Sequence, residues 1–265
     1  MDILERIVAD KRLEVAAARA AVPEDFLRSR LAAAPAPLPF RESLSASGHG
    51  IIAEFKRKSP SRGWIHEDID PGEVVPRYDA AGAAALSILT DSPYFGGSLD
   101  YIVRMRPLVK APILRKEFII DPYQLVEARA AGADAVLLIA SCLSRQECCR
   151  LLAEAHSLGL QVLLEVHTPQ ELDYVTPDVD ALGVNNRHLG SFHTDVQVSF
   201  AMARELRKRG LAGPDGPVLV SESGISSPET VRRLRDEGFR GFLMGERFMK
   251  EPDPGKALAD FISRI

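Results

Sequence analysis

The sequence predicts an α/β protein in which eight strand and helix units close into a (β/α)8 barrel, with an extra helix at the N-terminus. Short apolar runs typical of buried strands alternate with longer helical patterns from residue 51 onward. Several helical patterns end at a glycine just before the next apolar run, as is typical of helices that lead into buried parallel strands. The length of 265 residues also fits, because such a barrel needs about 250 residues.

The first 40 residues are predicted to precede the barrel. From Asp2 to Ala20, apolar residues recur at helical spacing with charged residues between them, which indicates a helix. Pro35, Pro37 and Pro39 then form a stiff connector, because proline fixes φ and lacks an amide hydrogen. We therefore expect a single barrel domain over residues 1–265, in which residues 1–40 are a helical extension and a proline-rich connector.

Eight segments after this connector are the predicted barrel strands. Gly82, Gly132 and Gly238 end the helical patterns before the second, fourth and eighth of them. An open doubly wound sheet is the alternative, but it normally carries a Gly-x-Gly-x-x-Gly turn after its first strand, and residues 55–60 contain no glycine. The predicted strands are residues 51–55, 85–89, 113–115, 135–139, 162–166, 181–184, 218–221 and 241–244.

Composition and charge exclude several classes of protein. The chain has 46% hydrophobic and 26% charged residues, and its net charge of −4 argues against nucleic acid, which needs a basic face. Its apolar runs are far shorter than the ~20 residues of a membrane helix, and the N-terminus lacks the apolar stretch of a signal peptide. We expect a cytoplasmic protein with no membrane contact, whose Cys142, Cys148 and Cys149 are reduced, buried thiols.

Polar side chains interrupt the predicted strands at their C-terminal ends, where barrel active sites lie. Residues two apart in a strand face the same way, so each strand sends alternate residues into the barrel. Structural ion pairs are the alternative, but burying charge is costly, which favours a catalytic site. By this parity, four strands direct six side chains to the barrel mouth: Glu54, Lys56, Lys116, Glu165, Asn185 and Arg187.

The turns after the last two predicted strands indicate a phosphate site. Ser223 and Gly224 follow the seventh strand, and Gly245 and Glu246 follow the eighth. Barrel enzymes often bind phosphate there, on backbone amides that small residues leave accessible.

Two features of the sequence stay open at this point. The long loop 59–66, which contains Trp64, is either a mobile lid or an exposed turn. His167 has no matching ligands at metal spacing, so a solvated or hydrogen-bonded histidine is favoured over a metal site, and no metal is expected.

Seven motifs in this chain resemble those of the indole-3-glycerol-phosphate synthase family, and the resemblance covers nearly the whole sequence. The first and fourth motifs are highly specific together, whereas the last recurs across phosphate-binding barrels. The motifs are IAEFKRKSPS at 52–61, SILTD at 87–91, YFGGS at 94–98, LRKEF at 114–118, LEVHT at 164–168, GVNNR at 183–187 and ESGI at 222–225.

The resemblance implies a TIM-barrel carboxy-lyase of tryptophan biosynthesis. Its substrate would be 1-(2-carboxyphenylamino)-1-deoxy-D-ribulose 5-phosphate, which is cyclised, decarboxylated and dehydrated to indole-3-glycerol phosphate. No cofactor is implied, because ring closure leaves an iminium that accepts the electrons released with carbon dioxide. The expected partner is the phosphorylated small-molecule substrate, and the protein is expected to be a monomer. Whether it also forms a complex with other enzymes of the pathway stays open.

The resemblance also implies a role for each site residue. Lys116 would be the general acid that protonates the substrate carbonyl, and Lys56 and Arg187 would hold the benzoate carboxylate. Either Glu54 or Glu165 would transfer the proton for dehydration, and this choice stays open. Asn185 would orient the sugar hydroxyls, and the other implied substrate contacts are Ser59, Phe95, Phe118, Leu137 and Leu189, with the phosphate on Ser223, Gly224, Gly245 and Glu246.

Two rival functions make different predictions for the same chain. A phosphoribosylanthranilate isomerase would be expected to lack both the N-terminal helix and the Glu-x-Lys pair of the first strand. A catalytically silent barrel would be expected to lose Lys116 or Glu165, and both are present. Glu117 stands where the family usually has aspartate, and we expect little effect because its side chain has opposite parity to Lys116.

Overall fold

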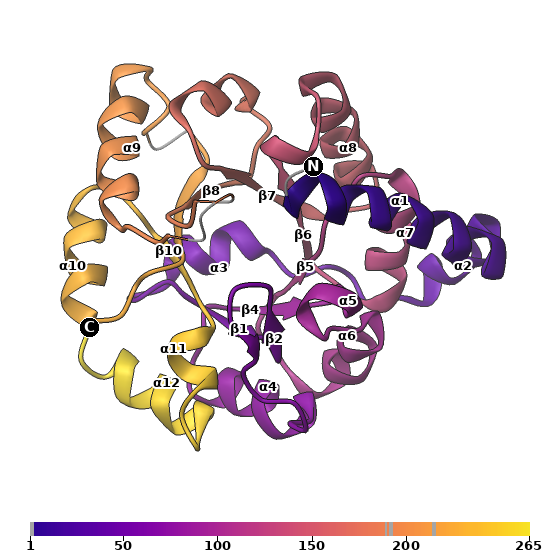
Figure 1. Cartoon of the computed structure of the whole chain (residues 1–265), viewed down its shortest axis with the longest axis horizontal. Helices are drawn as coiled ribbons and strands as arrows, with labels where there is room; N and C mark the ends of the chain where they lie inside the picture. Colours follow the sequence, from indigo (N-terminus) through magenta and orange to yellow (C-terminus); the bar gives the residue numbers. More distant parts are fainter. Residues whose placement is uncertain (1–2, 189, 191–192, 214–215) are drawn as a thin grey trace.

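A closed barrel of parallel strands is the centre of the protein. The computed structural model describes residues 3–188, 190, 193–213 and 216–265, and within these residues eight strands form the barrel (Figure 1). The predicted (β/α)8 TIM-barrel fold is thereby confirmed, and each predicted strand is found to within one residue at either end. The strands are β1 (Ile51–Phe55), β4 (Ala85–Leu89), β5 (Ile113–Lys116), β6 (Ala135–Ile139), β7 (Gln161–Val166), β8 (Ala181–Asn185), β9 (Val218–Glu222) and β10 (Gly241–Met244).

Helices connect the strands and surround the barrel (Figure 1). The glycines predicted to end helices have φ values of 87° at Gly82, 91° at Gly132 and 103° at Gly238, a left-handed conformation that favours glycine. Between β7 and β8 the described residues form the 3-10 helix η4 (Pro169–Tyr174) in place of an α-helix. The other connecting helices are α4 (Pro71–Ala80), α5 (Ser92–Phe95), α6 (Leu99–Met105), η2 (Arg106–Leu108), α7 (Pro122–Ala131), η3 (Ala140–Cys142), α8 (Arg145–Ser157), α9 (Gln197–Lys208) and α10 (Pro228–Asp236), and the last strand is followed by α11 (Glu246–Met249) and α12 (Pro254–Ile262).

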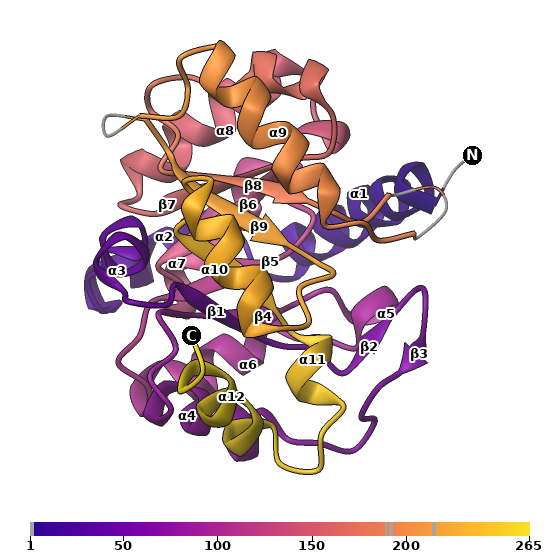
Figure 2. The ribbon, with the colours of Figure 1, turned by 90° about the vertical axis from the view of Figure 1, so that its left-hand side faces the viewer.

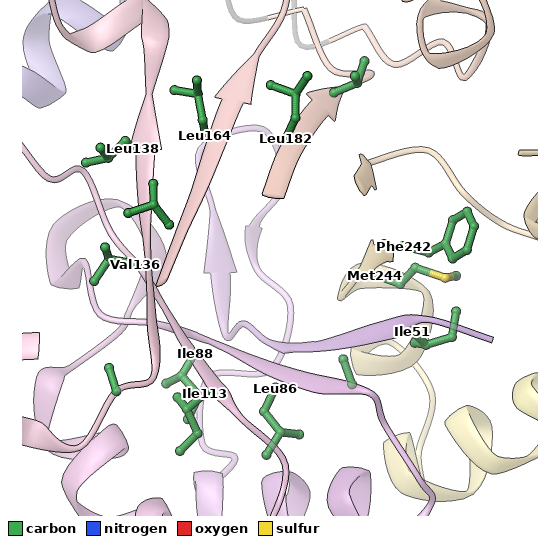
Figure 3. Close-up of a cluster of buried hydrophobic side chains, with 14 of the residues drawn as sticks. Ile51, Leu86, Ile88, Ile113, Val136, Leu138, Leu164, Leu182, Phe242 and Met244 are labelled. Atoms are coloured by element: carbon green, nitrogen blue, oxygen red, sulfur yellow. The ribbon is translucent and has the colours of Figure 1, made fainter. Parts of the chain in front are cut away.

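Strand alternation separates two apolar layers. Side chains of one parity pack between the strands and the helices, and Figure 3 shows several of them, including Val136, Leu138 and Leu164. Side chains of the other parity fill the lower half of the barrel interior and leave the C-terminal half to polar residues. The interior layer contains Ile52, Ala85, Leu114, Ala135, Leu137, Leu163, Ala181, Val220 and Leu243.

Helices that precede β1 lie at both ends of the barrel (Figure 2). The helix predicted over residues 2–20 is α1 (Ile3–Ala21), which lies on the side where the strands end. At the opposite end, α3 (Phe40–Ala46) packs Phe40 and Leu44 against the interior layer, and both side chains are fully buried. The short helices α2 (Glu24–Arg30), η1 (Leu31–Ala33) and α3 were not predicted from the sequence.

The cysteines are free, but they are not all buried as expected. Cys148 is buried, Cys142 is half-buried and Cys149 is exposed. Within the described part of the chain, no helix is long and apolar enough to cross a membrane.

A buried ion cluster fixes α1 to the barrel. The Lys11 Nζ lies 3.0 Å from Asp91 Oδ2 and 3.0 Å from Glu117 Oε1, and the Lys11 side chain is 2% exposed. Glu117 also accepts a hydrogen bond of 2.7 Å from the Thr90 hydroxyl. Although burial opposes the charge, these carboxylates raise the pKa of Lys11 above its usual value. Glu117, for which we expected little effect, thus joins the strands to the N-terminal helix.

Replacing Lys11 should destabilise the protein, because the change leaves two buried carboxylates without their cation. We expect Lys11→Met to lower the free energy of unfolding by about 3 kcal/mol, measured by urea denaturation. Arg12→Met is the matched control, since Arg12 is exposed on the same helix, and it should change that free energy by less than about 0.5 kcal/mol. Equal effects of the two substitutions would contradict the role assigned to the cluster.

Candidate active site

A single cavity at the C-terminal ends of the strands is lined by all six polar side chains that strand parity directs to the barrel mouth. They belong to β1, β5, β7 and β8 or follow these strands by one or two residues. The structure thus brings together Glu54, Lys56, Lys116, Glu165, Asn185 and Arg187.

Apolar side chains form one wall of this cavity. Phe95 and Phe118 line it with their ring centroids 6.0 Å apart and their planes tilted by 40°, and Leu137 and Ser59 line it as well. Leu189 lies outside the described residues. The remaining apolar lining includes Leu89, Ile139 and Leu243 from strands, and Ile3, Leu4 and Ile7 from α1.

Lysines and carboxylates face one another in the interior of this cavity. The Lys116 Nζ lies 3.6 Å from Glu165 Oε2 and 3.7 Å from Glu222 Oε2, and the Lys56 Nζ lies 2.8 Å from Glu54 Oε1. Burial opposes ionisation, but the carboxylates raise the pKa of Lys116. Against the same burial, Lys56 and Lys116 lower the pKa of Glu54, and Lys116 lowers that of Glu165. Lys116, Glu54 and Glu165 are therefore ionised at neutral pH.

Glu222 was missed from the sequence because the predicted strand stopped at Ser221. The strand β9 extends one residue further, and the parity through Val218 and Val220 directs Glu222 into the barrel. Glu222 is 1% exposed, and neither carboxyl oxygen has a hydrogen-bond partner among the residues described. Burial and the charge of Glu165 raise the pKa of Glu222 well above its usual value, although the nearby Lys116 opposes this shift.

The space that Glu222 occupies exists because residue 183 is a glycine. Gly183 lies in β8 opposite Glu165 in the strand register, and its own α-carbon faces the interior. A β-carbon at this position would overlap Glu222 Oε1 and would lie 3.3 Å from Leu163 Cδ1. Any larger residue must therefore displace the carboxyl group.

A second cavity adjoins the first on the side of β9 and β10. The four residues predicted to bind phosphate all line it, and these are Ser223, Gly224, Gly245 and Glu246. The two cavities share five lining residues, Glu54, Lys56, Arg187, Ser223 and Leu243, so they are two lobes of one groove.

Cationic side chains surround this second lobe, where Arg62, Arg187, Arg247 and Lys250 contribute to the lining. The Glu246 carboxylate lies 2.9 Å from Arg62 Nε and 3.8 Å from Arg187 Nη2. The charge of the Glu246 side chain is thus paired with arginines. Arg187 also donates a hydrogen bond of 2.8 Å to the Ser61 hydroxyl of the loop after β1.

The turn after β9 has a strained backbone that a buried network holds in place. Ser223 has a φ of 66°, and such a left-handed conformation is unfavourable for a residue other than glycine. The Asn186 amide donates hydrogen bonds of 3.0 Å to the Ser223 carbonyl and to the Ser221 hydroxyl. The side-chain oxygen of Asn186, Oδ1, accepts two more, from the amide and the hydroxyl of Ser199. Strain of this kind, held by a satisfied network, is typical of ligand-binding turns.

The loop after β1 contains a small hairpin, which the sequence did not predict. Its strands are β2 (Lys58–Ser59) and β3 (Gly63–Trp64). The Trp64 ring lies 5.3 Å from the Arg57 guanidinium and 5.3 Å from Lys58 Nζ, which are cation–π contacts. Within the hairpin segment 58–64, residues 59–61 reach the apolar lobe of the groove and Arg62 lines the second lobe, whereas Arg57 and Lys58 line neither.

The fold and the site together define a barrel enzyme for a small anionic substrate. Among the residues that the structure describes, no group of three or more His, Cys, Asp or Glu side chains could hold a metal ion. The chain belongs to the indole-3-glycerol phosphate synthase family, whose model matches residues 4–261. The resemblance of the sequence motifs is thereby confirmed.

Relatives of known name cover the chain from end to end. An indole-3-glycerol phosphate synthase from Bacteroides thetaiotaomicron is 53% identical over 100% of this chain and 99% of its own length. One from an Azoarcus species is 44% identical over 97% of both chains. A solved structure of tryptophan synthase subunit alpha from Legionella pneumophila has a TM-score of 0.58 at 15% identity, with 85% of this chain and 94% of that chain covered, which is a likeness of fold.

A side chain at position 183 should conflict with Glu222, and this conflict is measurable. We expect Gly183→Ala to lower the free energy of unfolding by about 1–3 kcal/mol, and the cost should largely vanish in a Glu222→Ala background. Gly48→Ala is the control, since a β-carbon there meets nothing within 4 Å. The steric assignment fails if urea denaturation gives the same cost for Gly183→Ala with and without the Glu222 side chain.

Proposed function

We propose that this protein converts 1-(2-carboxyphenylamino)-1-deoxy-D-ribulose 5-phosphate into indole-3-glycerol phosphate, carbon dioxide and water, as a lyase of tryptophan biosynthesis. The two-lobed groove carries this proposal together with the family membership. One lobe has the apolar wall that an aromatic ring requires, and the other has the cations and small-residue turns that suit a phosphate. A substrate with an aryl group at one end and a phosphate at the other matches both lobes at once.

Charged residues at the junction of the lobes suit the reacting centre. Lys56 and Arg187 line both lobes, so they can hold the benzoate carboxylate between the aromatic ring and the sugar. Lys116 donates its proton to the substrate carbonyl oxygen while the ring carbon that bears the carboxylate attacks the carbonyl carbon. The surrounding carboxylates keep Lys116 protonated before each turnover, and Asn185 orients the sugar hydroxyls.

In the decarboxylation and dehydration that follow, the carboxyl groups of the site take different roles. The electrons of the breaking carbon–carboxylate bond return to the ring iminium. Loss of the hydroxyl as water needs a proton, and Glu222 supplies it because it is the carboxyl group with a raised pKa. Glu54 and Glu165, whose pKa values are lowered, serve as bases. Glu222 is thus the proton donor in place of the two carboxylates that the sequence left open.

The rest of the chain supports the same reaction. Residues 1–265 act as one domain, because α1 contributes Ile3, Leu4 and Ile7 to the substrate cavity and α3 fills the opposite end of the barrel. The protein works in the cytoplasm as a monomer, with no cofactor. Because residues of one chain line the whole groove, the reaction needs no second chain, and the protein can still form a complex with other enzymes of the pathway.

The reaction is tested directly by mixing purified protein with the proposed substrate and following indole fluorescence in the presence of a chelator. Product formation is expected, and its absence would refute the function. Lys116→Met should lower kcat by at least about 100-fold with substrate binding largely kept. Lys110→Met is the control, since Lys110 is an exposed lysine just before the same strand, and its activity should match that of the unchanged protein.

The raised pKa of Glu222 gives the activity a defined pH dependence. A proton donor works only while it is protonated, so kcat should fall as the pH rises through the pKa of Glu222. Glu222→Gln should abolish that alkaline limb and lower kcat by about 100-fold at the optimum. Glu229→Gln alters an exposed carboxylate and should leave the profile intact. An unchanged alkaline limb in Glu222→Gln would remove Glu222 from this role.

A further inference from the structure

The His167 imidazole lies directly behind Glu165, outside the groove. His167 follows β7, and its Nε2 lies 3.2 Å from Glu165 Oε1, with the ring 9% exposed. This nitrogen therefore lies within ion-pair distance of a buried carboxylate. His167 does not line either lobe of the groove, so it acts on a substrate only through Glu165.

Both ring nitrogens of His167 face acceptors. On the Nδ1 side, the Ser141 Oγ is 3.3 Å away and Glu171 Oε2 is 3.9 Å away. The Ser141 hydroxyl donates its hydrogen to Glu171 Oε1 at 2.6 Å, which leaves its oxygen to accept from Nδ1. Because Nε2 faces a carboxylate, a proton is favoured on this nitrogen too. The arrangement therefore suits an imidazolium ion, with a hydrogen on each nitrogen.

The two oxygens of Glu165 have different partners. Oε1 faces His167 and accepts a hydrogen bond of 3.2 Å from the Asn185 amide, whereas Oε2 faces the Lys116 ammonium. Burial and the Lys116 charge disfavour protonation of His167, but Glu165 and Glu171 exceed these effects and raise its pKa. Cations on both sides of one buried carboxylate hold it ionised and fix its orientation.

We propose that His167 is a positioning residue for the reaction, whose imidazolium holds Glu165 ionised and aimed into the groove while Ser141 and Glu171 hold the imidazolium. The inference extends the proposed function, since it explains how two neighbouring carboxyl groups take opposite roles. The negative charge of an ionised Glu165 favours the protonated form of Glu222, so Glu165 can accept a proton and Glu222 can donate one. Without the His167 charge, the two carboxyl groups compete for that proton.

The charge of His167 is tested without any turnover, by NMR titration of the histidine side chains in the intact protein. The His167 signals, identified by their loss in His167→Gln, should titrate above the ordinary histidine pKa of about 6.5. The midpoint should fall in Glu165→Gln and, by less, in Glu171→Gln. A midpoint at or below the ordinary value would overturn the proposal. This result decides the matter even if the protein forms no indole product, so failure here is separate from failure of the proposed function.

The positioning role is tested by the pH dependence of kcat. In His167→Gln the pKa of Glu165 should rise, so the acidic limb of kcat should move upward by about one to three pH units, with KM changed much less than kcat. His167→Lys, which keeps a cation, should return the limb toward its original place. His156→Gln is the matched control, because the His156 Nε2 lies 2.8 Å from Asp180 Oδ2 and neither residue lines the groove. A uniform loss of kcat with an unmoved limb would show a structural role alone and refute the proposal.

Discussion

The ammonium group of Lys116 lies inside the barrel mouth with its side chain 16% exposed, and carboxyl groups from three strands face it and favour its charge. Glu54 of β1, Glu165 of β7 and Glu222 of β9 supply them. Two glycines make room for this arrangement: Gly183 for Glu222, and Gly245, where a β-carbon would lie 2.6 Å from Glu54 Oε1. The need to compensate the charge of Lys116 thus explains why acidic residues and glycines occur on several strands that are distant in sequence.

The carboxyl groups have similar chemistry but different surroundings, and the surroundings assign their protonation states. Against burial, Lys56 and Lys116 favour the ionised form of Glu54, and Lys116 and His167 favour that of Glu165. At Glu222, burial and the charge of Glu165 outweigh the effect of Lys116. Such divergence is the usual means by which one site provides both an acid and a base at neutral pH. Lys116 lies between Glu165 and Glu222, and in our proposal His167 completes the arrangement from behind Glu165.

Strand positions and the mouth residues could be predicted because they depend on local patterns. Apolar runs that follow glycine-ended helices marked the strands, and a period of two placed Glu54 and Lys56 in the interior. Glu222 was not predicted, because the predicted strand ended one residue too early, at Ser221. The same alternation of side chains would have placed Glu222 in the interior.

Other features depend on contacts between distant segments, which one sequence does not display. Lys11 meets Glu117 across more than a hundred residues, and the seven-residue helix α3 has too short an apolar pattern to be recognised before its barrel is known. The hairpin of β2 and β3 has strands of two residues each, below the length at which a pattern exists.

The position of α1 has a consequence for the order in which the site is assembled. Its anchors, Asp91 and Glu117, lie in the first half of the chain, next to β4 and β5, whereas β1 closes the barrel only by pairing with β10. During synthesis, the helix that covers the aromatic lobe therefore has its docking surface long before β9 brings Glu222. In chain order, the helix that covers the site and both of its anchors therefore precede the strand that carries Glu222.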